Sequence, residues 1–371
     1  MEFYDVAIIG LGPAGSILAR FLDSRYRVIA IDKKCGEEGG FQKPCGGLIS
    51  SEAQKVLASF DLPLPKELLV DPQIFAVKTI DLKSRLIQHY QRCYINLDRH
   101  KFDLWLESLI PSGVEIHSHA VCKQIKRDKS GFAVTYSENG DIDTIHAKYL
   151  VGADGANSLV RRTFFPNKKI RQYLAIQQWF TETHQNPFYS CIFDPETTDC
   201  CAWSISKDRQ FIYGGAFPAK HAKERFELQK QKLEKIGFRF GKPLKTEACL
   251  VLRPFAPWEF CCGEDNVFLI GEAAGFVSPS SLEGISSALV SAKGLSGVLN
   301  SGSGNLNRRY WAGTRGLRLK LFLKMLKCPF MYRPFLRRLV MKSGLQSIKM
   351  KQGQGKGAAE PTIFFSKADK A

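Results

Sequence analysis

The chain opens on an apolar run of strand length that ends in a cluster of glycines. Residues 4–9 are apolar apart from Asp5, the glycine cluster occupies 10–15, and an Ala- and Leu-rich segment follows it. A second strand-like run at 27–31, apolar after Arg27, ends in Asp32. Two buried strands separated by a glycine-rich turn and a helix form the βαβ unit from which parallel sheets are built. The start of the chain therefore predicts a doubly wound α/β domain.

Hydrophobic periodicity divides the rest of the chain into further elements. Apolar positions recur at helical spacing after Asp98, which stands at a favourable N-cap position. Apolar runs bounded by turn residues predict strands at 75–80, 86–94, 114–118, 121–127, 132–137, 146–151, 174–180, 189–193, 202–206, 211–217 and 267–271. Further helices are expected at 51–59, 160–162 and 220–235, and from the segment 283–285 to about 299.

These elements predict a Rossmann-like domain interrupted by a second, sheet-rich domain. A chain of 371 residues is long enough for two hydrophobic cores. The segments assigned to the nucleotide-type domain are 1–72, 95–168 and 250–300, and those assigned to the inserted domain are 73–94 and 169–249. Residues 305–345 are predicted to form a basic helical region, and 350–371 a disordered tail.

The glycine cluster has the spacing of a dinucleotide-binding loop. In Gly10-x-Gly12-x-x-Gly15 the first glycine allows the tight turn, the second lets a pyrophosphate approach the backbone, and the third lets the helix pack on the strand. The start of that helix offers N–H groups to phosphate oxygens. Asp32 stands where a ribose hydroxyl needs an acceptor. We therefore expect a dinucleotide cofactor, with Gly12 the position least tolerant of a side chain.

Composition narrows the compartment and the kinds of site. No apolar run is long enough to span a bilayer, and no basic segment followed by an apolar one precedes the first strand, so we expect a cytoplasmic protein. Eleven cysteines occur without a Cys-x-x-Cys spacing, and the vicinal pairs Cys200-Cys201 and Cys261-Cys262 are expected to be buried free thiols. The seven histidines have no ligand-like spacing, so we expect no metal site.

The positive charge is concentrated at the end of the chain. Residues 301–371 hold 16 Lys and Arg against Glu360 and Asp369, which is +14 of the formal net charge of +17. An asymmetry of this kind indicates an anionic partner for the terminal segment.

Basic and apolar residues are interleaved in that segment, at 317–327 and again at 335–342. Pro329 and Pro334 are expected to break the helix between the two stretches. We predict that residues 308–345 dock on an anionic membrane, peripheral to its inner face. The alternative is a pair of C-terminal helices that cap the core. No nucleic-acid-binding module is recognisable, so nucleic acid is not expected as a partner.

Three separated motifs resemble those of the p-hydroxybenzoate hydroxylase-like flavoproteins. They are the glycine cluster, the segment Gly152-Ala153-Asp154-Gly155-Ala156-Asn157-Ser158, and Leu269-Ile270-Gly271-Glu272-Ala273-Ala274 with Pro279 and Glu283-Gly284-Ile285. Within that superfamily, Lys43-Pro44-Cys45-Gly46-Gly47 and the short second domain resemble the geranylgeranyl reductase branch. The resemblance covers about residues 1–350. It implies a Rossmann-like FAD-binding domain, an inserted β-sheet-rich substrate domain and a helical C-terminus.

The resemblance also implies roles toward FAD. The glycine cluster would hold the pyrophosphate and Asp32 the adenosine ribose, while Arg99 would face the phosphate and ribityl region. Glu272 stands where the family usually has Asp, whose carboxylate accepts from a ribityl hydroxyl. The residues implied to contact FAD are Gly10, Gly12, Pro13, Ala14, Gly15, Asp32, Lys33, Cys45, Gly46, Gly47, Arg99, Asp154, Gly155, Gly271, Glu272, Gly284 and Ile285.

Two stretches depart from the family's patterns. Where reductases of this branch carry Tyr/Phe-x-Trp-x-Phe-Pro along the prenyl pocket, residues 201–206 retain only Trp203. We expect Trp203 and Trp179, together with Phe180, to wall an apolar substrate pocket. The family loop Pro-x-x-Gly-Glu-Gly has Leu282 in place of its first glycine, a change expected to narrow access to the flavin.

Cys45 is the expected catalytic residue. Reduction of an isolated alkene needs a proton donor at the second carbon, and the counterpart of Cys45 in the reductase branch lies over the flavin. Lys43, two positions earlier, is expected to lower the pKa of that thiol.

The resemblance thus implies an FAD-dependent reductase of carbon–carbon double bonds in a prenyl or other lipid-like substrate. The electron donor would be NAD(P)H or a ferredoxin-like protein, and we expect a monomer. Two alternatives remain open at this point. One is a flavin-dependent monooxygenase that uses NAD(P)H and O2. The other is a flavin-binding redox or membrane-surface protein that turns over no substrate.

Overall fold

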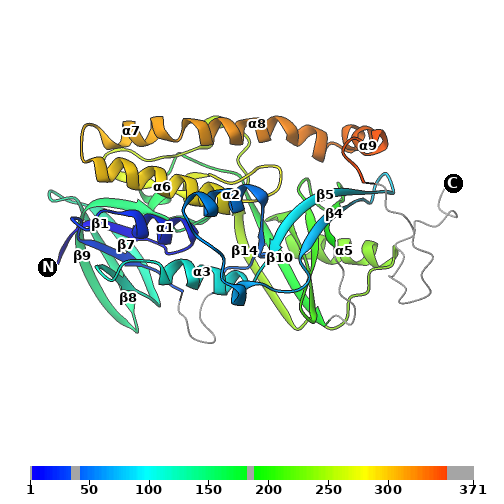
Figure 1. Ribbon diagram of the computed structural model, residues 1–371, viewed down its shortest axis with the longest axis horizontal. Helices are drawn as coiled ribbons and strands as arrows, with labels where there is room; N and C mark the ends of the chain where they lie inside the picture. Colours follow the sequence, from blue (N-terminus) through cyan, green and yellow to red (C-terminus); the bar gives the residue numbers. More distant parts are fainter. Residues whose placement is uncertain (1, 35–41, 182–187, 349–371) are drawn as a thin grey trace.

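The computed structural model describes residues 2–34, 42–181 and 188–348. In this part of the chain two β-sheets lie end to end along the long axis of the molecule, and helices pack on both (Figure 1). One sheet is largely parallel, whereas most strand pairs of the other are antiparallel. The predicted α/β class, with a Rossmann-like domain, a second sheet-rich domain and a helical C-terminus, is therefore confirmed.

The first sheet is built around β1 (Phe3–Ile9). On one side β1 pairs in parallel with β2 (Val28–Ile31), and on the other with β9 (Asp141–Gly152). All four residues of β2 are buried, as expected where both faces of a parallel sheet are covered. The remaining strands are β6 (Val114–His117) beside β2, β15 (Val267–Leu269) beside the end of β9, and antiparallel β8 (Phe132–Glu138) and β7 (Ala120–Arg127).

Helices cover this sheet and share its core. α1 (Pro13–Phe21) packs on α6 (Ile285–Ser301), and α6 also contacts α2 (Ser51–Ser59), whose bounds are those expected from the sequence. The predicted cap is confirmed at α3 (Arg99–Ser108), where Asp98 accepts hydrogen bonds from two backbone N–H groups at 2.8 and 3.0 Å. The shorter elements are η1 (Lys66–Leu68), α4 (Leu159–Phe164), η2 (Pro257–Glu259) and η3 (Gly271–Ala274).

The second sheet has eight strands in the order β14-β10-β13-β12-β11-β4-β5-β3. Their bounds are β3 (Leu48–Ile49), β4 (Ile74–Asp81), β5 (Leu86–Asn96), β10 (Gln172–Thr181), β11 (Phe188–Phe193), β12 (Ala202–Lys207), β13 (Gln210–Pro218) and β14 (Lys245–Leu252). The chain enters this sheet through the two segments 74–96 and 172–252, while β3 comes from the loop that precedes α2. The hydrophobic pattern predicted neither β3 nor β14.

The two faces of the second sheet have different neighbours. Phe180 is 1% exposed and belongs to the apolar core that the sheet shares with α5 (Ala222–Glu234). Its neighbour Trp179 projects to the other face, because successive side chains on a strand alternate. The expectation that Phe180 and Trp179 wall one pocket is therefore wrong.

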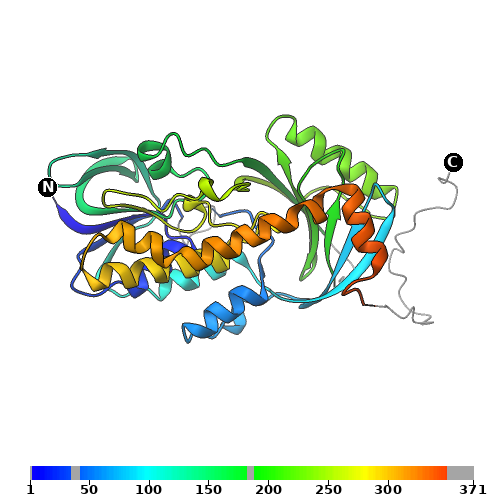
Figure 2. The ribbon, with the colours of Figure 1, turned by 90° about the horizontal axis from the view of Figure 1, so that it is seen from above.

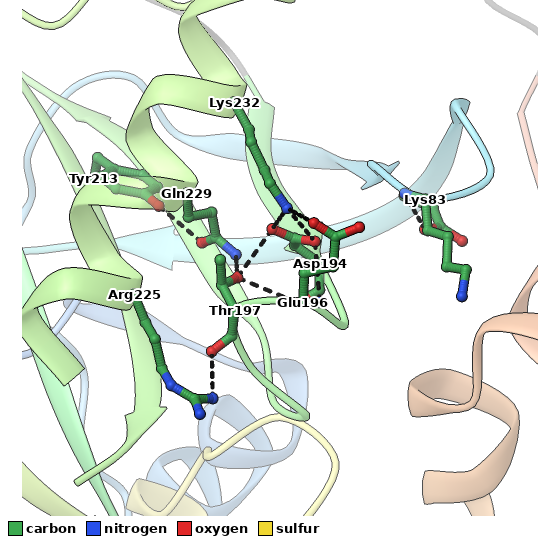
Figure 3. Close-up of polar contacts among 9 residues, drawn as sticks. Lys83, Asp194, Glu196, Thr197, Tyr213, Arg225, Gln229 and Lys232 are labelled. Atoms are coloured by element: carbon green, nitrogen blue, oxygen red, sulfur yellow. Dashed lines mark hydrogen bonds and ion pairs between the residues drawn. The ribbon is translucent and has the colours of Figure 1, made fainter. Parts of the chain in front are cut away.

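A buried polar network fastens α5 to its face of the sheet (Figure 3). Gln229 joins two strand regions, since its Oε1 accepts from Tyr213 at 2.8 Å and its Nε2 donates to Thr197 at 2.7 Å. Lys232 of the same helix donates to the buried carboxylate of Asp194 at 3.0 Å. These contacts hold α5 on one face of the second sheet. The opposite face, which we call the inner face, points toward the first domain.

The C-terminal helices cross from one domain to the other (Figure 2). They are α7 (Leu306–Gly313), α8 (Arg315–Tyr332) and α9 (Pro334–Ser343). Pro329 lies inside α8 and does not end it, so that part of the expectation is wrong; Pro334 instead occupies the first position of α9. A proline inside a helix removes one hydrogen bond, and a long helix that is packed on a core tolerates this loss.

One buried ion pair anchors α9 to the second sheet. The Arg337 guanidinium donates to both carboxylate oxygens of Asp81, at 2.9 and 3.0 Å. The two side chains are 5% and 0% exposed. A bidentate pair of this kind is satisfied internally, whereas either partner alone would be a buried charge without a counter-ion.

Replacing Arg337 by methionine is therefore expected to lower the free energy of unfolding by about 3 kcal/mol, because Asp81 remains buried without its partner. The same replacement at the exposed neighbour Arg338 is the matched control and is expected to cost less than about 0.5 kcal/mol. Urea denaturation followed by tryptophan fluorescence measures both. Equal losses in the two variants would show that this pair does not anchor α9.

Candidate functional site

The carboxyl ends of four parallel strands meet at one edge of the first sheet. The loops that follow β1, β2, β9 and β15 therefore lie together, although they are far apart in the sequence. These loops carry the glycine cluster, Asp32, Asp154 and Glu272. In open α/β sheets this edge is where ligands bind.

The three glycines of the cluster have different surroundings. A Cβ built on Gly10 would lie 2.7 Å from the carbonyl oxygen of Ala153, and one built on Gly15 would lie 1.8 Å from the carbonyl oxygen of Gly10. Both positions are thus closed by backbone. A Cβ on Gly12 would meet no atom of the described chain within 4 Å. Gly10 and Gly15 are required by the fold, whereas Gly12 borders open space.

The N-terminus of α1 opens onto that space. Gly12 is the N-cap and supplies no side-chain cap, while Pro13 begins the helix and Ala14 follows it. The first backbone N–H groups of a helix have no intrahelical acceptor, and the helix dipole adds partial positive charge there. This end of α1 is therefore suited to bind an anion such as a pyrophosphate.

Asp32 is held against the glycine cluster. Its carboxylate accepts from the backbone N–H of Leu11 and, at 2.6 Å, from that of Lys34. Lys34 is buried, pairs with Glu107 and reaches the carbonyl oxygen of Leu11 at 3.3 Å. The sequence analysis missed Lys34 as a support of the loop and named its neighbour Lys33, which is exposed.

Asp154 carries the clearest unsatisfied polar atom of this edge. Its Oδ2 accepts from the backbone N–H groups of Leu159 and Val160 at 2.6 and 3.3 Å. Its Oδ1 is buried and has no hydrogen-bond partner among the described residues. Burial raises the pKa of Asp154 above its ordinary value, and hydrogen bonds oppose that shift only in part. An orphan buried acceptor in native proteins marks a missing ligand or water.

Lys43 and Glu272 form an ion pair across this edge. Glu272 Oε2 accepts from Lys43 Nζ at 2.6 Å, and its Oε1 accepts from the backbone N–H of Leu252 at 2.9 Å. Gly155 lies beside the pair, since a Cβ built there would be 3.8 Å from Lys43 Nζ. Glu272 thus joins η3 to the 42–47 loop and to the end of β14. A ribityl hydroxyl that donated to Glu272 would therefore share a carboxylate oxygen that already has a protein partner.

The cations around Cys45 are Arg99 and Lys207. Arg99 donates from Nε to Asp103 at 2.9 Å. Burial lowers the pKa of Arg99, but Asp103 and the Cys45 thiol together raise it by more, so the net shift is upward. Burial lowers the pKa of Lys207 to about 8, against an upward effect of Cys45. The predicted neighbour Lys43 is instead bound to Glu272.

Lys207 is a functional candidate that the sequence analysis missed. It lies on β12 and donates to Asn96 Oδ1 at 2.8 Å and to the carbonyl oxygen of Leu97 at 2.6 Å. The backbone N–H of Leu97 in turn donates to the carbonyl oxygen of Gly47 at 2.9 Å. A strand lysine carries no local signal of this role, because only the pairing of distant strands brings it to the loop.

The 42–47 loop lies between the two sheets. A Cβ on Gly46 would approach Ile205 of β12 to 2.7 Å, so the loop backbone packs directly on the second sheet. The Cys249 thiol of β14 donates to the carbonyl oxygen of Pro44 at 3.7 Å. The Cys45 thiol accepts from the backbone N–H of Gly47 at 3.5 Å. Cys45 therefore stands where the first domain meets the inner face of the second.

That inner face carries two unpartnered polar atoms. Trp203 and Gln177 both pair with Gly214, one from each neighbouring strand. The Nε1 of Trp203 and the Oε1 of Gln177 are buried and have no partner in the described ranges. Glu247 fixes the orientation of the Gln177 amide by accepting from its Nε2 at 3.1 Å. One donor and one acceptor are thus presented without protein partners.

Trp179 and Leu282 border the same face. Trp179 donates to Glu247 at 2.7 Å, so its indole N–H is already satisfied. Leu282 adopts a φ of +57°, a left-handed conformation that favours glycine. Its side chain packs with Trp203 and Tyr332 on the cluster that includes Cys200 and Cys201. This left-handed conformation directs an apolar side chain against the second sheet, at a position where the family pattern has glycine.

The last predicted contacts lie at the start of α6. Gly284 is the N-cap of this helix and provides no side-chain cap, and Ile285 is the first helical residue. Glu283 accepts from the backbone N–H of Ser286 at 2.8 Å. Gly271 packs beside α1, with Ala14 at 3.0 Å from a Cβ built on it, so α6 and the glycine cluster belong to one assembly.

These features fit a dinucleotide better than a structural turn. The open space at Gly12, the uncapped start of α1 and the orphan oxygen of Asp154 lie on loops that meet at one sheet edge. Nearly all buried polar groups in native proteins find partners, and glycines that border open space are needed where a ligand approaches the backbone. The residues present therefore suit FAD as the resemblance implies.

The comparison of the chain with known proteins leads in the same direction. The profile of a family described as FAD binding domain matches residues 78–301. Protein CbrA of Escherichia coli K12 is 53% identical over 350 residues, which cover 94% of this chain and 99% of CbrA. CbrA of Shigella sonnei is similar to the same extent.

Solved structures share the fold at much lower sequence identity. A geranylgeranyl bacteriochlorophyll reductase-like protein from Thermoplasma acidophilum superposes with a TM-score of 0.76 at 18% identity, over 92% of this chain and 91% of that one. PqsL, a probable FAD-dependent monooxygenase from Pseudomonas aeruginosa, gives 0.67 at 17% identity over 93% and 100%. Reductase-like and monooxygenase-like proteins therefore share this architecture.

Valine at position 12 is expected to remove the bound flavin without unfolding the protein. Its side chain would enter the open space beside α1 while touching no backbone, in contrast to a side chain at Gly15. The visible flavin absorbance per chain measures the bound flavin, and the far-ultraviolet circular dichroism measures whether the protein is folded. Gly113→Val, at an exposed glycine with no neighbour within 4 Å, is the control. Stoichiometric flavin in the Gly12→Val protein would contradict the placement of the pyrophosphate.

Proposed function

Because the chain belongs to the FAD-binding domain family of oxidoreductases, we propose that it uses FAD to reduce a carbon–carbon double bond in a lipid-like substrate. The family gives the cofactor and the oxidoreductase class. The choice of reductase chemistry depends on one observation, which is the place of Cys45 between the cofactor edge and an inner sheet face that is apolar and rich in thiols.

The chain's contribution to the cofactor is binding and orientation. The start of α1 and Gly12 would hold the pyrophosphate, Asp32 the adenosine ribose, and the Asp154 Oδ1 a hydroxyl of the cofactor. Bound FAD, once reduced by NAD(P)H or a ferredoxin-like protein, would supply the two electrons as a hydride equivalent. Helix α6 begins after Gly284, and Glu283 accepts from one of its first backbone N–H groups, that of Ser286; the remaining end of the helix would place partial positive charge near the cofactor.

The inner face of the second sheet supports an apolar substrate. Trp203, Leu282 and Tyr332 pack around the buried thiols Cys200 and Cys201. The rings of Tyr94 and Tyr189 meet edge to face nearby. Burial raises the pKa of Tyr94 to about 12, and Cys191, Cys201 and Glu283 add to this rise. Such phenols stay neutral and offer no base at physiological pH. The unpartnered Trp203 Nε1 and Gln177 Oε1 would bind one polar group of an otherwise apolar molecule.

Cys45 supplies the proton in this proposal. Addition of hydrogen to a double bond delivers a hydride to one carbon and a proton to the other, and the Cys45 S–H bond breaks as the second C–H bond forms. The negative charge left on the sulfur lies near Arg99 and Lys207, whose pKa values the Cys45 sulfur raises. A proton from solvent then restores the thiol.

Anaerobic reoxidation of the reduced flavin tests this function. The holoprotein is reduced under argon by NADPH, by NADH or by a reduced ferredoxin, and a total lipid extract in detergent is then added. Reoxidation without oxygen, with a lipid product two hydrogen atoms heavier by mass spectrometry, is the expected result. Reoxidation that requires O2 and adds oxygen to the product would assign a monooxygenase instead. Failure of every donor to reduce the flavin would assign a protein that turns over no substrate.

Alanine at Cys45 is expected to separate the two half-reactions. The Cys45→Ala protein should bind FAD and accept electrons at nearly the wild-type rate, while anaerobic reoxidation by lipid slows by about 100-fold, the usual contribution of a general acid. Cys93→Ala, at an exposed cysteine of β5, should leave both steps unchanged. Loss of flavin from Cys45→Ala, with normal turnover of the flavin that remains, would assign Cys45 a structural role.

A further inference from the structure

Helix α8 has apolar residues on two opposite sides. Leu317, Leu321 and Met325 recur at a spacing of four and are buried against the core. The opposite side carries four more large apolar residues that face solvent, at positions that fall on one stripe of a helix with 3.6 residues per turn. Their exposed fractions are 55% for Leu319, 51% for Leu323, 54% for Leu326 and 54% for Phe330. A helix that only capped the core would need the first stripe alone.

Helix α9 repeats this arrangement. Arg337 and Met341 face inward and are buried, while Phe335 and Leu339 are 71% and 52% exposed. Seen from above, α8 and α9 lie along the same side of the molecule (Figure 2). We name as the outer face of α8–α9 the exposed apolar residues Leu319, Leu323, Leu326, Phe330, Phe335 and Leu339.

The charged residues of α8 and α9 themselves are all basic. No aspartate or glutamate occurs between Glu283 and Glu360. Exposed basic residues flank the apolar ones on both helices, and they are Arg315, Lys327, Arg333, Arg338 and Lys342. Lys320 and Lys324 turn instead to Glu52 of α2, at 3.0 and 2.8 Å, and so fasten α8 to the protein. The helix is thus held by some of its lysines while other basic residues border the exposed stripe.

We propose that the outer face of α8–α9 binds the surface of an anionic lipid bilayer, with both helices lying in the plane of the interface. Exposed leucine and phenylalanine would enter the acyl boundary, and the flanking Lys and Arg would meet lipid phosphates. Within the described residues there is no helix long and apolar enough to cross a membrane. The contact is accordingly a peripheral one.

Charge excludes the other occupants of such a surface. In a two-fold dimer the same face would meet itself, and the exposed basic residues that flank it would then oppose an identical set. A nucleic acid would pair with the basic residues but would leave the leucine and phenylalanine stripe in water. An anionic bilayer is the partner whose surface offers phosphate charge and apolar depth together.

The inner side of the same helix reaches the proposed substrate site. Met331 and Tyr332, at the end of α8, pack against the same buried cluster of the second sheet as Trp203 does, and the Tyr332 hydroxyl donates to the carbonyl oxygen of Ser280 at 2.7 Å. Phe330, their neighbour, belongs to the outer face. Docking would therefore bring the bilayer to the far side of α8 from the buried cluster against which Trp203 packs. That this cluster borders the substrate site rests on the proposed function.

Vesicle sedimentation of the FAD-loaded full chain tests the docking without any turnover. We expect binding to vesicles that mix phosphatidylglycerol into phosphatidylcholine, and little binding to phosphatidylcholine alone. Raising the salt concentration should weaken the binding, since the basic residues act through screened charge. Failure of the enzyme assay would leave this result unaffected, so the two proposals fail separately.

Matched variants identify the surface. Leu323→Glu should abolish sedimentation, whereas Leu228→Glu, at a leucine of α5 that is 43% exposed, should not. Replacing Arg338 and Lys342 by glutamine should lower the partition coefficient about thirtyfold, at about 1 kcal/mol per charge. The same change at the exposed Lys223 and Lys235 is its control.

Three results would overturn the proposal. They are no binding of the wild-type chain to either vesicle, equal binding to both regardless of salt, and losses in the α8 or α9 variants that equal those in their α5 controls. Thermal unfolding of each variant confirms that it is folded before its binding is compared.

Discussion

The close approach of two backbone loops is the constraint on which this structure depends. The loop after β1 touches the loop after β9 so closely that Gly10 has no space for a side chain beside Ala153, while Gly15 is closed by the carbonyl oxygen of Gly10. This contact is possible only because β1 and β9 pair in parallel with no strand between them, from Phe3 opposite His146 to Ile9 opposite Gly152. It brings the start of α1 beside Asp154 and leaves the open space at Gly12. A cofactor site thus follows from strand order, and the three glycines are its local consequence.

The second sheet completes the site from the other side. It is joined to the first domain by the backbone N–H of Leu252 on Glu272, by the Cys249 thiol on the 42–47 loop, and by the Lys207 ammonium on Leu97. Each of these contacts joins segments that are far apart in sequence. Polar groups with no partner among the described residues remain on both sides of the junction, on Asp154 in one domain and on Trp203 and Gln177 in the other. Because a buried polar group without a partner is costly, their placement indicates ligands on both sides.

The sequence predicted what is encoded locally. The glycine cluster, the helix at 51–59 and the Asp98 cap follow from turn chemistry, helical periodicity and side-chain capping, and each is confirmed as a structural element. The partner of Lys43, the role of Lys207 and the opposite direction of Phe180 depend on strand pairing, which periodicity does not contain. Pro329 inside α8 shows the same limit, since packing of the helix on the core outweighs the lost hydrogen bond. The two apolar stripes of α8 could be read from the sequence, but only the structure shows which one remains exposed.

The central claim is that the edge shared by the two domains holds FAD, and the flavin released from the purified protein tests it most directly. The chain is denatured by heat, and the supernatant is separated by chromatography against FAD, FMN and riboflavin standards. Because we propose that the start of α1 binds a pyrophosphate and Asp32 an adenosine ribose, the account predicts FAD at close to one molecule per chain. Release of FMN, which has neither group, or binding of no flavin after incubation with excess FAD, would contradict it.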